Sequence, residues 1–170
     1  MRRSGFWMVC YGVESGDNKV LEMNLKEATV EQARKAVREA NKAGLNVWGY
    51  FILGMYGETR ESMERTINLS LEEPFDIVNF AISAPYPGTR WGEIAEREGW
   101  MVDKRWEAYD QNYSAQVSQP GCEVELVREY QRKAYKRWYL SNRGLRFLSR
   151  GFRPEYFSYF WNTIRDHVRN

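Results

Sequence analysis

Three apolar runs, each followed by a cluster of small and polar residues, dominate the first hundred residues of the chain. The runs cover residues 6–13, 45–53 and 75–84, and glycine or proline bounds each of them. Short continuous apolar runs of this kind are typical of parallel strands that are buried on both faces. Apolar positions between the runs recur at helical spacing. The pattern therefore predicts a strand–helix unit repeated three times, with right-handed crossovers.

Local signals place the ends of the predicted helices. The residues expected to cap helix amino termini are Asp17, Thr29, Thr59 and Thr89. Gln32, three residues after Thr29, completes a capping box, and Gly44 is placed to end that helix in the left-handed conformation. Three parallel strands make half of a TIM-like barrel, so the fold class expected is α/β, a partial barrel with an edge that must be covered.

The repeat ends near Gly99, and the rest of the chain has a different character. We divide it into the half-barrel at residues 1–100, an irregular connection at 101–122 and a mainly helical extension at 123–170. The extension begins with a strong helix over 123–140. Asn142-Arg143-Gly144 and Gly151 are expected to break helices, and Pro154 suits the first turn of a last one.

Charge separates the same parts of the chain. The net charge is only +2, but residues 123–170 carry 11 Lys and Arg against five Asp and Glu. Three interpretations of this basic, aromatic extension stay open: a helical cap on the sheet edge, a surface for a flat tetrapyrrole bearing carboxylates, or RNA binding. RNA is the least favoured, because no RNA-binding module is visible. Neither a signal peptide nor a membrane-spanning apolar run is evident, so a cytoplasmic location is expected.

The cysteine inventory excludes most metal chemistry. Cys10 and Cys122 are the only cysteines, and His167 is the only histidine. Neither a zinc site nor an iron–sulfur site can be assembled from them. Cys10 lies in an apolar run and is expected in the core, whereas Cys122 is given no role.

The polar clusters after the three runs are the candidate site. They read Gly12-Val13-Glu14-Ser15-Gly16, then Gly54 with Gly57-Glu58-Thr59, then Pro85-Tyr86-Pro87-Gly88-Thr89. In a parallel α/β protein such clusters meet at the carboxyl ends of the strands, where these folds build their sites.

With these motifs in this order, residues 4–100 resemble the second half of a radical S-adenosylmethionine enzyme of the cobalamin-binding group. The extension, with its Arg137-Trp138-Tyr139-Leu140 helix end, is similar to the magnesium-protoporphyrin monomethyl ester oxidative cyclase branch. The resemblance implies that Glu14 and Ser15 contact the ribose hydroxyls of S-adenosylmethionine. It also implies that Ile52 and Gly54 lie against the adenine.

The third cluster completes the pocket that the resemblance implies. Ala84 and Pro85 fall where the backbone of the last strand meets the adenine, and Glu58 falls near the pocket rim. One departure is visible, because Met55-Tyr56 stand where the family commonly has a proline before Gly-Glu-Thr. No catalytic residue is assigned.

The family also holds a 4Fe–4S cluster on three cysteines spaced Cys-x3-Cys-x2-Cys, and this chain has no such triplet. We therefore expect a fragment of a radical S-adenosylmethionine oxidoreductase that is inactive alone and is completed by the missing amino-terminal half of its barrel. Its substrate would be a small molecule, with a porphyrin and a cobalamin cofactor left open. The alternative is a non-catalytic complementing subunit or docking module derived from such a barrel.

Overall fold

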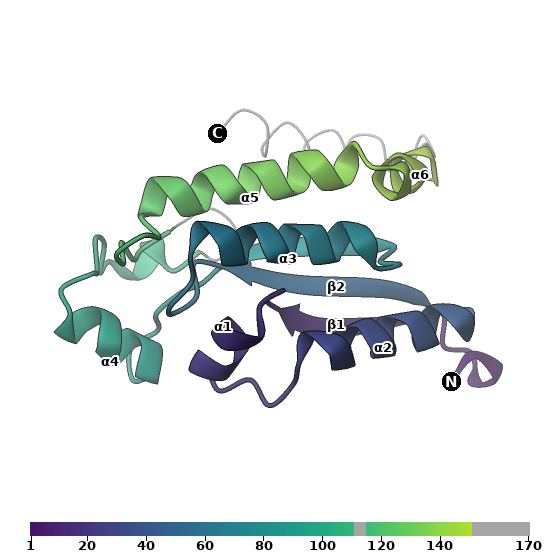
Figure 1. The fold of residues 1–170 in the computed structure, drawn as a ribbon, viewed down its shortest axis with the longest axis horizontal. Coiled ribbons are helices and arrows are strands. Elements are labelled where there is room, and N and C mark those ends of the chain that lie inside the picture. The colour runs from purple at the N-terminus through teal and green to yellow at the C-terminus, as the bar shows by residue number, and fades with distance from the viewer. Residues whose placement is uncertain (111–114, 151–170) are drawn as a thin grey trace.

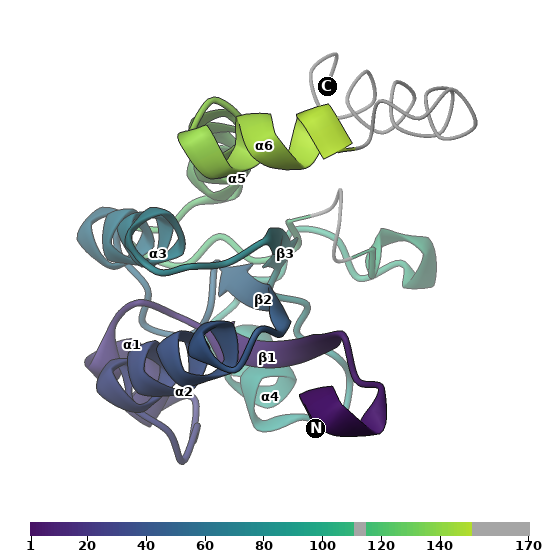
Figure 2. The same ribbon diagram turned by 90° about the vertical axis from the view of Figure 1, so that its right-hand side faces the viewer.

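One parallel sheet organises the structure, a computed structural model that describes residues 1–110 and 115–150. Its strands are β1 (Met8–Glu14), β2 (Asn46–Leu53) and β3 (Ile77–Ile82), in the order β1-β2-β3. Both pairings are parallel. Figure 1 shows β1 and β2 pointing in one direction, and Figure 2 shows β2 between β1 and β3. The predicted partial barrel of three parallel strands is confirmed.

Helices follow the strands where the sequence predicts them. Their bounds are α1 (Asn18–Met23), α2 (Val30–Lys42), α3 (Arg60–Glu72), α4 (Arg90–Arg97), α5 (Val124–Tyr139) and α6 (Asn142–Arg150), with 3-10 turns at Arg2–Ser4 and Trp106–Ala108. All four expected caps are formed, and Thr29 with Gln32 makes the capping box. Gly44 has φ 75° just after α2. The short-range signals therefore fixed the helix starts correctly.

The two faces of the sheet differ sharply. In β2 and β3 the side chains that alternate toward the helices are buried, including Val47, Phe51 and Phe80, which are 0% exposed, whereas in β1 only Val13 is buried. Figure 2 shows α2 and α3 on this one side. None of the residues that alternate to the opposite side, here called the open face, is buried. Its members are Met8, Cys10, Gly12, Trp48, Tyr50, Ile52, Ile77, Asn79 and Ala81.

The open face corrects two expectations about the first apolar run. Only Val13 of β1 is buried, so this strand is not covered on both faces. Cys10 is exposed rather than a core residue. The physical reason is that one side of a half-barrel faces an interior that no described helix fills. The side of β1 that faces this interior carries apolar residues, as a strand buried on both faces would, so the apolar pattern does not distinguish the two cases.

Helix α5 covers the β3 edge. The Tyr135 hydroxyl accepts a hydrogen bond from the Phe80 amide at 3.1 Å, and Gln131 Nε2 donates to the Phe80 carbonyl at 2.7 Å. These two side chains satisfy backbone groups that a further strand would otherwise pair. The helical extension is therefore part of the same core as the sheet, and the Tyr135 ring packs edge-on to Phe80.

The end of α5 shows one further correction. A break does occur before α6, but Gly144 lies inside α6 rather than ending a helix. A side chain at this position would collide with the Trp138 carbonyl, so glycine permits α6 to cross close to α5. The expectations for Gly151 and Pro154 concern residues outside the described ranges.

Candidate functional site

The carboxyl ends of the three strands bring the three motifs to one edge of the sheet. Glu14 ends β1, Gly54 follows β2, and Ala84 with Pro85 follows β3. Because the strands are parallel and adjacent, these positions share an edge, at the arrowheads in Figure 1. Ile52 lies on the open face just before this edge and is half-buried. The predicted site residues are therefore gathered at one end of the sheet.

Glu14 has an unusual backbone that directs its carboxylate. The register of β1 shifts between Gly12 and Glu14, and Glu14 has φ 65°, a left-handed value that is uncommon outside glycine. Its Oε1 lies 2.5 Å from where a Cβ on Gly12 would stand, so it curls over the open face. Lys26 Nζ lies 3.3 Å from the same oxygen. A side chain at Gly12 would displace this carboxylate, which is the chemical reason for glycine there.

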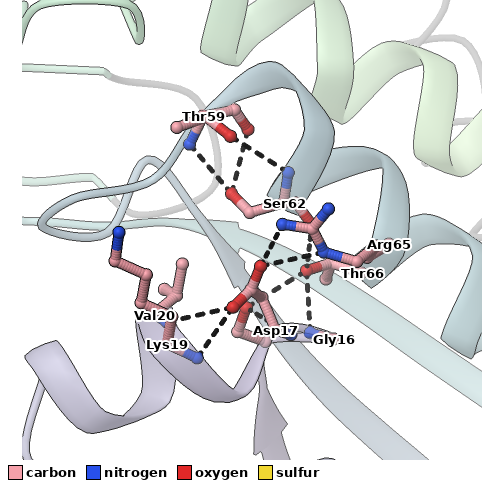
Figure 3. Close-up of polar contacts among 9 residues, drawn as sticks. Gly16, Asp17, Lys19, Val20, Thr59, Ser62, Arg65 and Thr66 are labelled. Atoms are coloured by element: carbon pink, nitrogen blue, oxygen red, sulfur yellow. Dashed lines mark hydrogen bonds and ion pairs between the residues drawn. The ribbon is translucent and has the colours of Figure 1, made fainter.

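Ser15 and Gly16 face the other way and dock onto α3. Ser15 is 0% exposed, and its hydroxyl lies 3.3 Å from Thr66 Oγ1. The Gly16 amide donates to the same Thr66 oxygen at 2.8 Å, and Thr66 donates to the Ser62 carbonyl. A Cβ on Gly16 would lie 2.5 Å from the Arg65 carbonyl. Figure 3 shows this loop against α3. In this structure the Ser15 hydroxyl holds the loop and is shielded from solvent.

Asp17 completes the attachment of the β1–α1 loop. Its carboxylate accepts hydrogen bonds from the amides of Lys19 at 2.7 Å and Val20 at 3.3 Å, and it pairs with the Arg65 guanidinium. Partial burial opposes ionisation, but the Arg65 hydrogen bond and the two amides outweigh it and lower the pKa of Asp17. The loop that carries Glu14 is therefore fixed at both ends.

Glu58 lies under the β2–α3 loop rather than at a solvent-exposed rim. It is 2% exposed, and one carboxyl oxygen accepts hydrogen bonds from the Gly54 amide at 2.6 Å and the Met55 amide at 3.1 Å. Burial raises the pKa of Glu58 to about 8, although these amides act in the opposite direction. Its role in the structure is to hold the turn at Gly54, where φ is 79°.

Side chains from distant segments clamp the same loop. Gln119 Nε2 donates to the Met55 carbonyl at 2.7 Å, while its Oε1 accepts from the Gly57 amide at 2.9 Å. Asn24 Nδ2 donates to the Tyr56 carbonyl at 2.9 Å. Met55 and Tyr56 occupy the positions where a proline was expected, and these contacts supply the rigidity of the turn by other means.

The end of β3 completes the edge. The Ser83 amide donates to the Leu53 carbonyl at 2.8 Å, which keeps the two chains together past the last strand residues. Ala84 is half-buried and Pro85 is buried. The Tyr86 amide donates to the Ala84 carbonyl at 3.0 Å, so the chain turns sharply there.

Helix α4 closes one side of this end of the molecule. It lies beyond the carboxyl ends of the strands rather than beside the sheet (Figure 1). Arg90 donates to the Met23 carbonyl at 3.1 Å, and the rings of Trp91 and Tyr56 are 5.4 Å apart. The loops after β1 and β2 are thereby linked to α4.

Lys26, Gln119 and Asn24 contact the site residues, and none of them was predicted from the sequence. Lys26 lies 12 positions after Glu14, beyond α1, and Asn24 acts on Tyr56, which is 32 positions away. Gln119 acts across 62 and 64 positions on Gly57 and Met55, which no short-range pattern reveals.

The described residues hold no group of three His, Cys, Asp or Glu side chains that could bind a metal ion. Cys10 is exposed on the open face, and Cys122 is buried. Burial raises the pKa of the Cys122 thiol to about 12, with nearby Glu58 contributing, so this sulfur stays protonated. The two thiols do not fit a cluster that needs three thiolates.

Comparison with known proteins agrees with this geometry. Residues 1–70 match the model of the radical SAM superfamily, named for S-adenosylmethionine. The chain is related to radical SAM enzymes. An uncharacterized methyltransferase of Pyrococcus horikoshii is 34% identical over 140 residues, which are 82% of this chain and 30% of that protein. The anaerobic magnesium-protoporphyrin IX monomethyl ester cyclase of Rubrivivax gelatinosus is 31% identical over 86 residues, 51% of this chain and 16% of the cyclase.

A solved structure supports the fold alone. Elp3 from Methanocaldococcus infernus, with an N-terminal deletion, superposes with a TM-score of 0.52 at 16% identity, covering 79% of this chain and 37% of Elp3. The chain spans less than a third of the length of the two curated relatives described above. In residues 1–110 and 115–150, no helix is both long and apolar enough to cross a membrane.

Proposed function

We propose that this chain forms the adenosyl side of the S-adenosylmethionine pocket in a radical SAM enzyme. The observation that carries the proposal is the placement of Glu14. A register shift, a left-handed backbone and the absent side chain of Gly12 together put a half-buried carboxylate over the open face at the carboxyl end of β1. A carboxylate there can accept hydrogen bonds from both hydroxyls of a ribose.

The other contacts follow from the same edge. Ile52 presents an apolar side chain on the open face, and the backbone at Gly54 and Ala84 borders it, so an adenine ring can lie across the ends of β2 and β3. Ser15 and Glu58 contribute in our proposal by holding their loops, since the hydroxyl of one is bonded to Thr66 and the carboxyl of the other is 2% exposed.

The iron–sulfur cluster of the family supplies the electron that cleaves S-adenosylmethionine, and this chain offers two cysteines for three positions. We therefore propose that the cluster ligands come from outside these 170 residues, from the other half of the barrel. The exposed edge of β1 and the uncovered open face support such a partner. In a completed barrel, a further strand would pair with the β1 edge, and the open face would be enclosed.

The proposed reaction rests on the names of the relatives alone. The relatives described above are named a methyltransferase and a cyclase. We favour a cyclase-like oxidoreductase that acts on a small molecule, with a tetrapyrrole as one candidate substrate. Cobalamin is a candidate second cofactor. The competing proposal is a non-catalytic subunit that completes another barrel, and the same uncovered β1 edge supports it.

Anaerobic reconstitution of the 170-residue chain with iron and sulfide tests the division of labour. We expect no stoichiometric cluster in the absorbance spectrum and no micromolar S-adenosylmethionine binding by calorimetry. The adenosyl contacts alone are a few hydrogen bonds of roughly 0.5–3 kcal/mol each, against an association cost of roughly 4–15 kcal/mol. A stoichiometric cluster on this chain would contradict the proposal.

A further inference from the structure

A second cavity lies at the amino ends of the strands, at the opposite end of the sheet from the proposed S-adenosylmethionine pocket. Its volume is about 250 Å³. Figure 1 shows α6 at this end of the molecule and α4 at the other. The start of each strand contributes to the lining, and α6 covers it; the residues used below are Trp7, Asn46, Asp76, Arg143, Arg146 and Phe147.

The position of α6 over this cavity is fixed by contacts with α5. The Ser141 hydroxyl accepts a hydrogen bond from the Gly144 amide at 3.2 Å, within the first turn of α6. The ring of Phe147 packs edge-on against Trp138, with the ring centroids 6.0 Å apart, and Trp138 is 1% exposed. The arginines of α6 are therefore carried by an anchored helix.

Two arginines of α6 line the cavity without a partner in the described chain. Arg143 and Arg146 are three positions apart, which places them on the same face of the helix. Neither guanidinium makes a hydrogen bond or an ion pair with a described residue. Like charges at this spacing repel each other, and an oxyanion between them would remove the repulsion. The fork of a guanidinium also matches the oxygens of a carboxylate or phosphate.

One carboxylate lines the same cavity, and the backbone engages it. Asp76 Oδ2 accepts a hydrogen bond from the Val47 amide at 3.0 Å, and the Asp76 amide donates to the Val47 carbonyl at 2.8 Å. Asp76 thus links the starts of β2 and β3. Two guanidiniums face one carboxylate, so the charge of the lining remains positive.

Polar and aromatic side chains complete the lining. Asn46 is half-buried, and its side-chain amide has no hydrogen bond with a described residue, so it is available as a further donor. Trp7 is 60% exposed where it borders the cavity, and Phe147 lies on the α6 side. Aromatic rings and guanidinium planes both stack on flat ring systems.

We propose that this cavity binds a planar apolar molecule that carries a carboxylate or phosphate group. Arg143 and Arg146 hold the anionic group, Asn46 Nδ2 donates to it, and Trp7 contacts the flat body. The site lies at the far end of the sheet from Glu14, so the inference is independent of the S-adenosylmethionine pocket.

Nuclear magnetic resonance of the 170-residue chain tests the proposal with four small probes at matched ionic strength. Benzoate and phenyl phosphate carry a ring and an anion, benzamide carries the ring alone, and acetate carries the anion alone. We expect saturable shifts of the Trp7 indole and the Asn46 side-chain amide with benzoate, phenyl phosphate or both, and the stronger of the two identifies the anionic group. Benzamide and acetate should bind at least about tenfold more weakly, because each lacks one of the two interactions.

Matched variants show which side chains are used. The double variant Arg143→Gln with Arg146→Gln should weaken binding of the ring-bearing anion by about tenfold or more. Trp7→Ala should weaken it as well but leave acetate unchanged. Arg60→Gln removes an exposed arginine of α3 and should have no effect. Shifts that are linear, that benzamide reproduces at equal strength, or that survive the double variant would overturn the proposal.

Discussion

The substitution Glu58→Gln probes how the β2–α3 loop of the site is held. The folded chain keeps Glu58 protonated up to a pKa of about 8, against 4.5 for the free side chain, because the group is buried. Between these values the folded state binds more protons than the unfolded state, so the free energy of unfolding must fall as the pH rises. At 1.36 kcal/mol for each pKa unit, this effect reaches at most roughly 4–5 kcal/mol.

Glutamine removes the titration and keeps the geometry. Its Oε1 can accept the same hydrogen bonds from the Gly54 and Met55 amides, while its Nε2 replaces an oxygen that has no partner in the described chain. Protonated Glu58 also carries an unpaired donor at this oxygen, so glutamine adds little cost while the acid is neutral. The variant should therefore be about as stable as wild type at pH 5 and increasingly more stable than wild type as the pH rises to 8.

Urea unfolding at pH 5, 6, 7 and 8 measures this, and the difference between the two proteins cancels every other titrating group. Glu22→Gln, at an exposed position of α1, is the matched control and should run parallel to wild type. If Glu58→Gln also ran parallel to wild type, Glu58 would be ionised in the folded chain at neutral pH and our account of the loop would be wrong.

Three further outcomes are expected. A thiol reagent should label Cys10 quickly in the native chain, because Cys10 is exposed. It should label Cys122 only on unfolding, because Cys122 is buried and burial raises the pKa of its thiol to about 12. Rapid labelling of both thiols would contradict the structure. Tyr135→Phe should lower the free energy of unfolding by about 1–3 kcal/mol in chemical denaturation, because it leaves the Phe80 amide unpaired on the β3 edge; an unchanged midpoint would mean that α5 does not cover this edge. Glu73 should make the chain sensitive to acid, because its arginine partners lower its pKa despite burial. The stability that this carboxylate contributes is present above about pH 4.5 and is lost as the pH falls through the lowered pKa. In acid titrations, a Glu73→Gln variant should not show this loss of stability.

The parts of the fold that the sequence predicted are those with local causes. Thr29 with Gln32, and Thr59 three residues before Ser62, form caps from side chains within one turn of each other. The apolar runs predicted the three strands to within two or three residues. Their parallel order could be predicted because a helix lies between consecutive strands, and a crossover of this kind joins parallel strands.

The failures have a common physical origin. Apolar composition showed that β1 is a strand but not which side of the sheet is covered, so Cys10 was assigned to the core. The Gln119 clamp and the α5 contacts to Phe80 join segments 51 to 64 positions apart, and no periodicity encodes them. The resemblance placed Glu58 near the pocket rim, and only the packing around it shows that its carboxyl is buried.

The most direct test of the central claim is to map S-adenosylmethionine onto the chain by amide chemical shifts at millimolar concentration. We expect shifts that cluster at Glu14, Gly54 and Ala84, that disappear in Glu14→Gln, and that persist in the control Glu22→Gln. Shifts confined to the amino ends of the strands, or unaffected by Glu14→Gln, would contradict the claim that this edge of the sheet receives the adenosyl group.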